Sequence, residues 1–230
     1  MAPIVSEFYR DAHLRRGVDI RLGAQVVGLS GEDGSVRRVH LSDGSDVAAD
    51  LVIVGIGVEP RTKLARQLGL AIDGGIVVDR YARTSNPAIV AAGDCAVAPD
   101  PLTGEGLVRL ESVQNAVSQA KAAAATLSGR LEPNVAVPWF WSDQYDLKLQ
   151  IAGLSAGYDH CVLRGDIGGE AFSVLYYRRG ELLAVDAVNA GPDYMAVRKA
   201  LTQGATIAPE AAADSALRLR ELIVPGAIGA

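Results

Sequence analysis

A glycine–aspartate pair behind an apolar run is the most promising place for chemistry in this sequence. Residues 89–92 read Ile-Val-Ala-Ala and are followed directly by Gly93 and Asp94. A strand that ends there would put the Asp94 carboxylate at the carboxyl edge of a sheet, where α/β proteins bind ligands. Gly93 has no side chain, so a ligand could approach its backbone closely. Asp94 could then accept hydrogen bonds from a polyol, although a plain turn or a helix cap would need the same two residues.

A helix that begins near residue 112 is the second candidate element. Ser112 is a good N-cap, and one apolar stripe is predicted along the helix from Val113, Ala116, Val117, Ala120, Ala124 and Leu127. A helix N-terminus offers unpaired N–H groups and a partial positive charge of roughly half a unit. It could therefore stabilise negative charge on a ligand ring. The stripe could equally serve simple core packing, and the two roles are compatible.

The composition excludes several other classes of function. The chain has 230 residues, of which 49% are hydrophobic and 21% charged, and its net charge is −5. The basic residues are scattered, which argues against nucleic acid or an anionic membrane as a partner. No apolar run reaches the roughly 18 residues of a membrane span, and the first residues do not resemble a secretory signal. Cys95 and Cys161 lie far apart and form no metal-binding spacing with the three histidines. We expect a cytoplasmic protein without a metal site.

The elements that must position these residues follow from hydrophobic periodicity and turn signals. Helices are predicted from Val5 to Ala12, over residues 63–68, from Ser112 to Gly129, over residues 194–201 and near Pro209. Strands are predicted over residues 18–22, 25–29, 36–41, 46–54, 75–79, 89–92, 149–154, 160–163, 172–177 and 182–187. Residues 51–57 are almost wholly apolar, which is typical of a strand buried on both faces. Residues 178–181 predict a hairpin turn.

Three segments together give the sequence a family resemblance. Residues 84–94, residues 111–116 and residues 137–145 (Val-Pro-Trp-Phe-Trp-Ser-Asp-Gln-Tyr) resemble the FAD-dependent, NADH-linked ferredoxin reductases. This is the putidaredoxin reductase and rubredoxin reductase family, which serves P450 and Rieske oxygenase systems. The resemblance implies an incomplete α/β FAD/NAD(P)-binding reductase fold followed by a small α+β reductase C-terminal domain. It divides the chain into the remainder of an NAD domain (1–57), a returning FAD-domain segment (58–134) and the C-terminal domain (135–230).

The same resemblance implies a set of FAD-binding residues. Asp94 matches the acid that binds the ribityl chain, with Gly93 beside it. Val113 matches the residue whose main chain meets the flavin ring. Trp141 matches an aromatic residue beside that ring, near where the ferredoxin docks. Without the flanking motif, ordinary burial would account for Trp139 and Trp141.

The resemblance also implies a second cofactor and an electron acceptor. Ile56 and Gly57 match the strand end that lies against the nicotinamide of NADH. Hydride would pass from NADH to FAD, and single electrons would leave to a [2Fe-2S] ferredoxin or a rubredoxin. This chemistry needs no catalytic acid or base from the protein. The disulfide-reductase branch is excluded because Cys95 has no second cysteine near it in the sequence.

The sequence departs from the family in one large respect, because it contains no GxGxxG turn. The nearest string, residues 55–60, has Pro60 where the third glycine should be. Cofactor pyrophosphates bind such a turn and the helix N-terminus behind it. We therefore expect only the ribityl and ring side of an FAD site. The simplest explanation is that the sequence is part of a longer protein; a split enzyme whose partner chain supplies the N-terminal half needs more assumptions. The alternative function is a non-catalytic fragment that binds a protein or dimerises.

Overall fold

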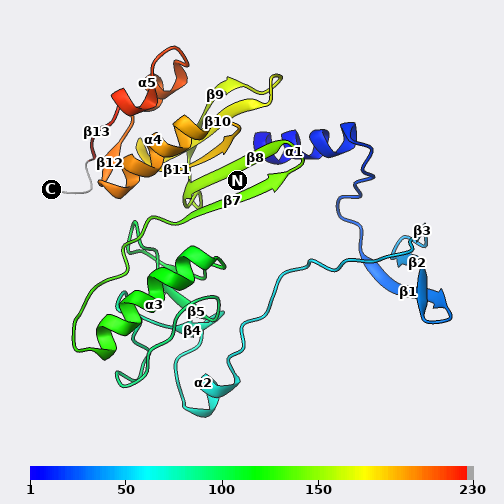
Figure 1. Cartoon of the computed structure of the whole chain (residues 1–230), viewed down its shortest axis with the longest axis horizontal. Coiled ribbons are helices and arrows are strands. Elements are labelled where there is room, and N and C mark those ends of the chain that lie inside the picture. Colours follow the sequence, from blue (N-terminus) through cyan, green and yellow to red (C-terminus); the bar gives the residue numbers. More distant parts are fainter. Residues whose placement is uncertain (227–230) are drawn as a thin grey trace. The chain divides into compact units, whose positions relative to one another are not determined.

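The computed structural model describes residues 1–226. These residues divide into two compact units, one formed by Glu7–Glu59 and the other by Met1–Ser6 together with the chain from Pro60 onward. Figure 1 shows the elements of each unit in chain order. We describe the two units separately below and call them the small unit and the large unit.

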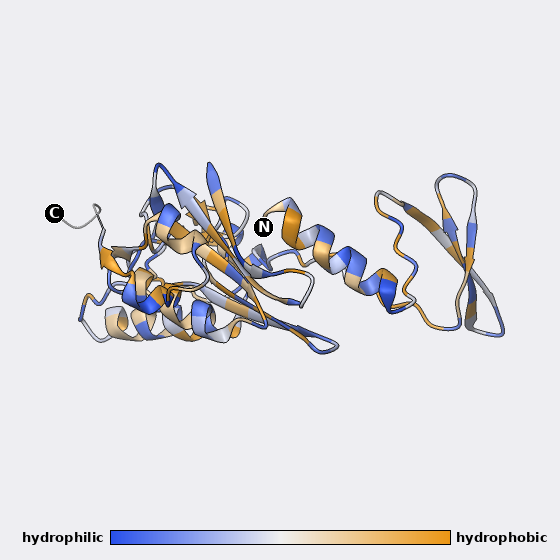
Figure 2. Cartoon of the chain, turned by 90° about the horizontal axis from the view of Figure 1, so that it is seen from above, coloured by the Kyte–Doolittle hydropathy of each residue, from blue (hydrophilic) through white to orange (hydrophobic). Residues whose placement is uncertain are grey.

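Helix α1 (Pro3–Arg15) and a three-stranded sheet open the chain. The predicted helix is confirmed, and Gly17 follows it with a φ of +82°, as a residue behind a helix end often has. Orange apolar residues gather at the N-terminal end of α1 in Figure 2, where Ala2 and Val5 are buried. The strands β1 (Val26–Glu32), β2 (Ser35–Leu41) and β3 (Asp46–Ala48) pair antiparallel in that order.

Two strand predictions in the small unit are wrong. Residues 18–22 form no strand, and the predicted strand over residues 46–54 stops at Ala48. Its apolar continuation, residues 51–57, is extended chain whose large side chains lie in solvent; Ile56 is 91% exposed. A parallel strand is stable only between neighbours that pair with its backbone and cover its faces. Within residues 1–226 no strand pairs with either segment, so an apolar sequence alone does not make a strand here.

A small mixed sheet and a long helix form the first part of the large unit. Helix α2 (Lys63–Gln67) is followed by β4 (Ile76–Val77), β5 (Ala96–Pro99) and β6 (Leu107–Val108). β4 runs parallel to β5, and β5 antiparallel to β6. The strand predicted over residues 89–92 is wrong, since that segment makes only a single bridge, between Val90 and Arg83. The chain turns at Gly93, whose carbonyl accepts from the Ala96 N–H at 2.9 Å, and regular pairing begins only after this turn.

Helix α3 (Val113–Leu127) begins where expected but buries a different face. Its buried residues are Gln119, Ala122, Ala123 and Ala125. Ala122 and Ala123 pack against Ala82 and Val90, and the Thr126 hydroxyl donates to the Tyr81 carbonyl at 2.7 Å. Small side chains allow this close approach of helix and loop. The predicted apolar stripe is therefore solvent-exposed in large part, and its larger members are Val113, Val117 and Leu127.

A five-stranded antiparallel sheet dominates the rest of the large unit. Its order is β7 (Trp139–Gln144), β8 (Leu147–Gly153), β11 (Glu181–Val188), β10 (Ala171–Arg178) and β9 (His160–Asp166). The four strands predicted here are confirmed, and β7 is an addition. The predicted hairpin turn between β10 and β11 is confirmed too, because Arg179 and Gly180 both have positive φ, as a type I′ turn requires.

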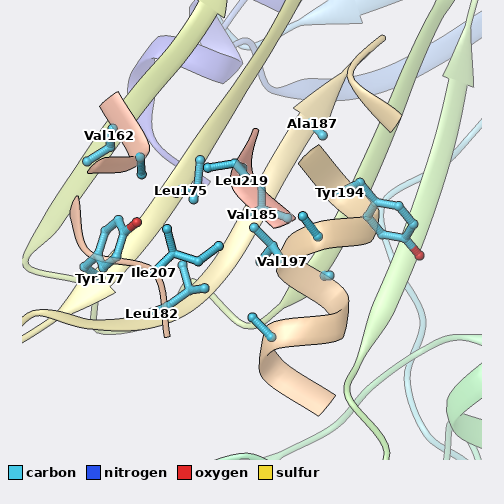
Figure 3. Packing of buried hydrophobic residues seen from close by; sticks show 14 residues of the cluster. Val162, Leu175, Tyr177, Leu182, Val185, Ala187, Tyr194, Val197, Ile207 and Leu219 are labelled. Carbon is cyan, nitrogen blue, oxygen red and sulfur yellow. The ribbon is translucent and has the colours of Figure 1, made fainter. Parts of the chain in front are cut away.

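Helices and short elements behind the sheet close its core. They are α4 (Gly191–Thr202), β12 (Ala205–Thr206), α5 (Pro209–Ala213), the 3₁₀ helix η1 (Leu219–Glu221) and β13 (Val224–Pro225). Both predicted helices are confirmed. Figure 3 shows Val197 of α4 and Ile207 among Leu175, Tyr177 and Val185 of the central strands. This apolar cluster fixes α4 against the sheet, and through it the residues that α4 carries.

The opposite face of the central strands holds a buried polar pair. Asp186 on β11 is 2% exposed, and the Tyr176 hydroxyl donates to its Oδ2 at 2.5 Å. The same hydroxyl accepts from the Ala2 N–H at 2.8 Å. Burial raises the pKa of Asp186, although the hydrogen bond from Tyr176 acts in the opposite direction. A buried carboxylate is costly unless it is hydrogen-bonded, so this pair makes stability depend on pH.

We predict that Asp186→Asn becomes more stable relative to the wild-type chain as the pH rises from about 4, the ordinary pKa of an aspartate, towards neutrality. Because the folded chain holds the Asp186 proton to a higher pH than the unfolded chain, wild-type stability falls as the pH rises through this window. Asparagine does not titrate and can still accept from Tyr176. Urea unfolding at several pH values, followed by tryptophan fluorescence, measures the difference. A difference independent of pH would contradict the prediction.

Candidate functional site

The start of α3 is one wall of the site. The Ser112 side chain accepts from the Asn115 N–H at 3.2 Å and so caps the helix. The Asn115 side chain in turn donates to the Leu110 carbonyl at 2.9 Å, which ties the approaching chain to the first turn. The remaining N–H groups of that turn have no partner within the helix. The helix therefore presents donors and a partial positive charge at its N-terminus.

The turn at Gly93 lies directly against α3. Gly93 is buried with a φ of +82°, and its N–H donates to Oε1 of Gln119 at 2.7 Å. A Cβ at this position would meet the Ala116 Cβ at 3.5 Å, but the positive φ is strained for any other residue. Gln119 is itself only 4% exposed. The hydrogen bond thus fixes the glycine–aspartate turn relative to the helix.

Asp94 lies on the outer side of this turn. Its side chain is exposed, and its carbonyl accepts from Nη1 of Arg109 at 3.2 Å. The same guanidinium forms an ion pair with Glu111 at 2.5 Å. Arg109 and Glu111 precede the helix cap, so the turn at Gly93 and the start of α3 are joined a second time. The Asp94 carboxylate remains accessible to a ligand.

Aromatic residues of β7 form the facing wall. Trp139 and Phe140 line a pocket of about 230 Å³ together with Ser112, Gln114 and Asn115 from the start of α3. Behind the pocket wall, Trp139 stacks with Trp141 at a centroid distance of 5.7 Å and an interplanar angle of 27°. Residues two apart on a strand share a face, which explains this contact. Trp141 is 48% exposed and does not line the pocket itself.

The structure brings some of the predicted residues together and not others. Gly93 and Asp94 are joined to α3 as described, and Val113 is the first residue of that helix, with its side chain 74% exposed. Trp141 does not line the pocket, but it stacks on Trp139, which does. Ile56 and Gly57 belong to the small unit, where Gly57 has a φ of +89° and open space around it. The cofactor contacts assigned to these six residues stay predictions.

Sequence reasoning missed several residues that build the pocket. Arg109 and Gln119 join the glycine turn to α3, and Phe140 and Asn134 line the cavity. One signal in the sequence could have identified Gln119. It follows Ser112 by seven residues, which is about two helical turns, so both residues lie on the same side of the helix. No sequence pattern identifies Arg109, because its hydrogen bond to the Asp94 carbonyl depends on the turn at Gly93.

Comparison with known families decides the chain's membership. The model of the pyridine nucleotide-disulphide oxidoreductases matches residues 1–120. The chain belongs to this family. A second family model, the reductase C-terminal domain, matches residues 139–223. The expected family and fold class are thereby confirmed: part of a pyridine nucleotide-disulphide oxidoreductase domain is followed by a reductase C-terminal domain.

Individual members of the family agree with this membership. The chain is 45% identical to rhodocoxin reductase of Rhodococcus erythropolis and covers 51% of it, with 96% of the chain aligned. Putidaredoxin reductase of Pseudomonas putida is 42% identical, with 96% of this chain and 53% of the relative covered. The ferredoxin reductase crystal structure from Rhodopseudomonas palustris superposes with a TM-score of 0.91 at 40% identity, covering 97% of this chain and 55% of that one. The chain spans about half the length of the relatives it matches. Within residues 1–226, no helix combines the length and apolar character of a membrane span.

We predict that Gln119→Ala loosens the turn at Gly93. The substitution leaves the buried Gly93 N–H without an acceptor, which costs roughly 1–3 kcal/mol. Amide hydrogen exchange at Gly93 should therefore accelerate, and NMR measures this directly. Gln114→Ala is the matched control, since it makes the same change on the same helix away from that hydrogen bond. Equal exchange rates at Gly93 in the two variants would show that Gln119 does not hold the turn.

Proposed function

We propose that this chain forms the flavin-ring side of the FAD site in an NADH-linked ferredoxin reductase. The observation that carries the proposal is the pocket between the N-terminus of α3 and the aromatic residues of β7. Its volume of about 230 Å³ is below the roughly 300–1,000 Å³ of complete small-molecule sites. A pocket of that size is suited to one end of a large cofactor.

The residues that line the pocket fit the ring of FAD, and the turn at Gly93 beside α3 fits the ribityl chain; Gly93, Asp94 and Val113 do not line the pocket themselves. Trp139 and Phe140 offer an apolar wall for a planar ring. The first turn of α3 offers N–H donors to a polar ring edge. Gly93 allows close approach of a ligand to the backbone, and the exposed Asp94 carboxylate can accept hydrogen bonds from ribityl hydroxyls. Val113 contributes its main chain at the helix start.

The chain's own residues act by position and electrostatics. FAD, when bound, would supply the redox chemistry of hydride transfer from NADH and of single-electron transfer to a redox protein. The dipole of α3 stabilises negative charge in the pocket. Trp139 and Phe140 exclude water from it, which strengthens that effect. No proton transfer by a side chain is required.

NADH and a redox protein complete the proposed reaction. Ile56 and Gly57 are proposed to lie against the nicotinamide, where a glycine leaves room for the ring. Putidaredoxin reductase has been solved in a covalent complex with putidaredoxin, and a rubredoxin-NAD(+) reductase of Ectopseudomonas oleovorans is 34% identical. We propose a [2Fe-2S] ferredoxin of a P450 or Rieske oxygenase system as the acceptor, with rubredoxin as the alternative, and a cytoplasmic location.

Exposed apolar surfaces suggest that the chain does not act alone. Val113, Val117 and Leu127 of α3 are exposed, and so is the apolar stretch over residues 51–57. Exposed apolar side chains grouped on one element in this way favour a protein interface. The sequence also contains no GxGxxG turn for a pyrophosphate. We propose that a polypeptide corresponding to the N-terminal half of the relatives covers these surfaces and supplies both turns. The same surfaces favour the second candidate, a non-catalytic module that binds a protein or dimerises.

We predict that the purified chain alone is nearly colourless near 450 nm and does not reduce ferricyanide with NADH. Coexpression with a polypeptide that carries both glycine-rich turns should give a yellow complex with that activity. Absorbance of the purified fractions and a ferricyanide assay measure both, and the second polypeptide expressed alone is the control. Stoichiometric, tightly bound FAD on the chain alone would contradict the need for a partner. A stable complex that holds no flavin would favour the non-catalytic module.

We predict that Asp94→Ala in the assembled enzyme weakens FAD binding by roughly 1.5–3 kcal/mol, the usual value of a hydrogen bond to a charged group. Flavin retained after dialysis measures the loss. Asp73 is, like Asp94, an exposed aspartate of the large unit outside the pocket lining. No contact with FAD is proposed for it, so Asp73→Ala should retain its flavin. Equal retention in the two variants would show that Asp94 does not bind the cofactor.

A further inference from the structure

A cation on α4 lies over the Trp139 indole of β7. The guanidinium carbon of Arg198 is 4.6 Å from the ring centroid of Trp139. It is also 6.0 Å from the ring of Tyr194, and its Nη1 donates to the Tyr194 hydroxyl at 3.3 Å. Tyr194 is one helical turn before Arg198, so the two share a face of α4. Tyr194 belongs to the apolar core between α4 and the sheet, and this fixes the base from which Arg198 reaches the indole.

Arg198 is held by aromatic groups rather than by a carboxylate. In the part of the chain that the structure describes, it forms no ion pair, while Arg164 of β9 pairs with Asp193 of α4 at 3.1 Å. Arginine commonly stacks on aromatic faces because its guanidinium is planar and weakly hydrated. A half-buried cation without a carboxylate partner is stabilised by the electron-rich face of Trp139. The contact therefore selects one orientation of that indole.

The orientation of Trp139 affects two features of the structure, the pocket and the stack with Trp141. Trp139 lines the pocket together with the start of α3. Trp141 stacks on Trp139 and is half-exposed. If the Trp139 indole rotated away, the pocket would lose an apolar wall and the stack would be broken. A group that fixes the Trp139 indole therefore fixes both the pocket wall and the stack with Trp141.

We infer that Arg198 is a positioning residue: it holds the Trp139 indole in its stack with Trp141 and thereby shapes the aromatic wall of the pocket. Arg198 does not line the pocket and acts through Trp139. The part of this inference that concerns flavin rests on the function proposed above. The part that concerns the indole pair stands on the contacts alone.

The two tryptophans of the stack are the only ones in the sequence, so their spectra report on this pair. Stacked indoles couple their electronic transitions and give a paired positive and negative band in circular dichroism. We expect this paired band to be lost, and the fluorescence maximum to shift, in Arg198→Leu and Arg198→Gln. Arg198→Lys keeps a cation and should retain most of the signal. Lys199→Leu removes the neighbouring, exposed charge of the same helix and should match the wild-type chain.

Binding of lumiflavin, the ring without its ribityl chain, tests the consequence for the pocket. Quenching of flavin fluorescence should show affinity reduced roughly two- to fivefold in Arg198→Leu and Arg198→Gln, the factor that corresponds to one exposed cation–π contact. Arg198→Lys should lie between them and the wild-type chain, and Lys199→Leu should bind as the wild type does.

The two readouts separate the possible failures. Indole spectra that are unchanged in both neutral variants would overturn the positioning role, whatever lumiflavin does. Altered spectra with unaltered lumiflavin affinity would overturn the link from Arg198 to the pocket wall. If the wild-type chain binds no lumiflavin, the proposed flavin site fails, while the spectra still decide whether Arg198 holds the stack. If Arg198→Leu does not fold, the comparison of Arg198→Gln with Arg198→Lys still separates a neutral from a charged side chain, and both side chains are polar.

Discussion

The hydrogen bond from the Gly93 N–H to Gln119 is the interaction on which the candidate site depends. It is short, buried and formed by two residues far apart in sequence. It lets a helix and a tight turn meet with only small side chains between them, Ala116 on one side and a glycine on the other. A buried donor without an acceptor is costly, so the turn has little freedom to move away from α3. Asp94 and the N-terminus of α3 are consequently held in fixed relation to each other.

The second wall depends on packing in a different part of the fold. β7 is an edge strand of the five-stranded sheet, and its aromatic residues would have several rotamers available without neighbours. Tyr194 and Val197 anchor α4 in the apolar core, and α4 carries Arg198 to the face of Trp139. The pocket is thus assembled from two elements whose positions are fixed by separate cores. This arrangement places an apolar, aromatic wall opposite a helix N-terminus, which suits a ring that gains negative charge.

The sequence predicted well those elements whose partners lie inside the chain. β10 and β11 have nearly continuous hydrophobic patterns because neighbouring elements of the same unit cover both their faces. β8, β9 and α4 have partial patterns because they are only partly covered. The failures have a common physical cause. Residues 51–57 and the larger members of the α3 stripe, Val113, Val117 and Leu127, carry the patterns of buried elements, yet most of these side chains lie in solvent among the described residues. Residues 89–92 failed for a local reason, since the positive φ at Gly93 delays the strand until Ala96. The candidate site was found in outline from its motifs, but Arg109, Gln119 and Arg198 act through tertiary contacts that no spacing in the sequence reveals.

The proposed function requires that this chain holds one end of FAD and that a partner holds the other end. Cleavage of FAD between its two phosphates gives FMN and AMP, and each can be added to the isotopically labelled chain alone. We predict that FMN shifts the backbone amide signals of Gly93, Asp94, the first turn of α3 and Trp139, while AMP shifts none of them. The two-dimensional amide spectrum of the chain, recorded during both titrations, measures this residue by residue. Shifts caused by AMP at these residues, or FMN shifts confined to other surfaces, would show that the pocket does not hold the flavin end of FAD.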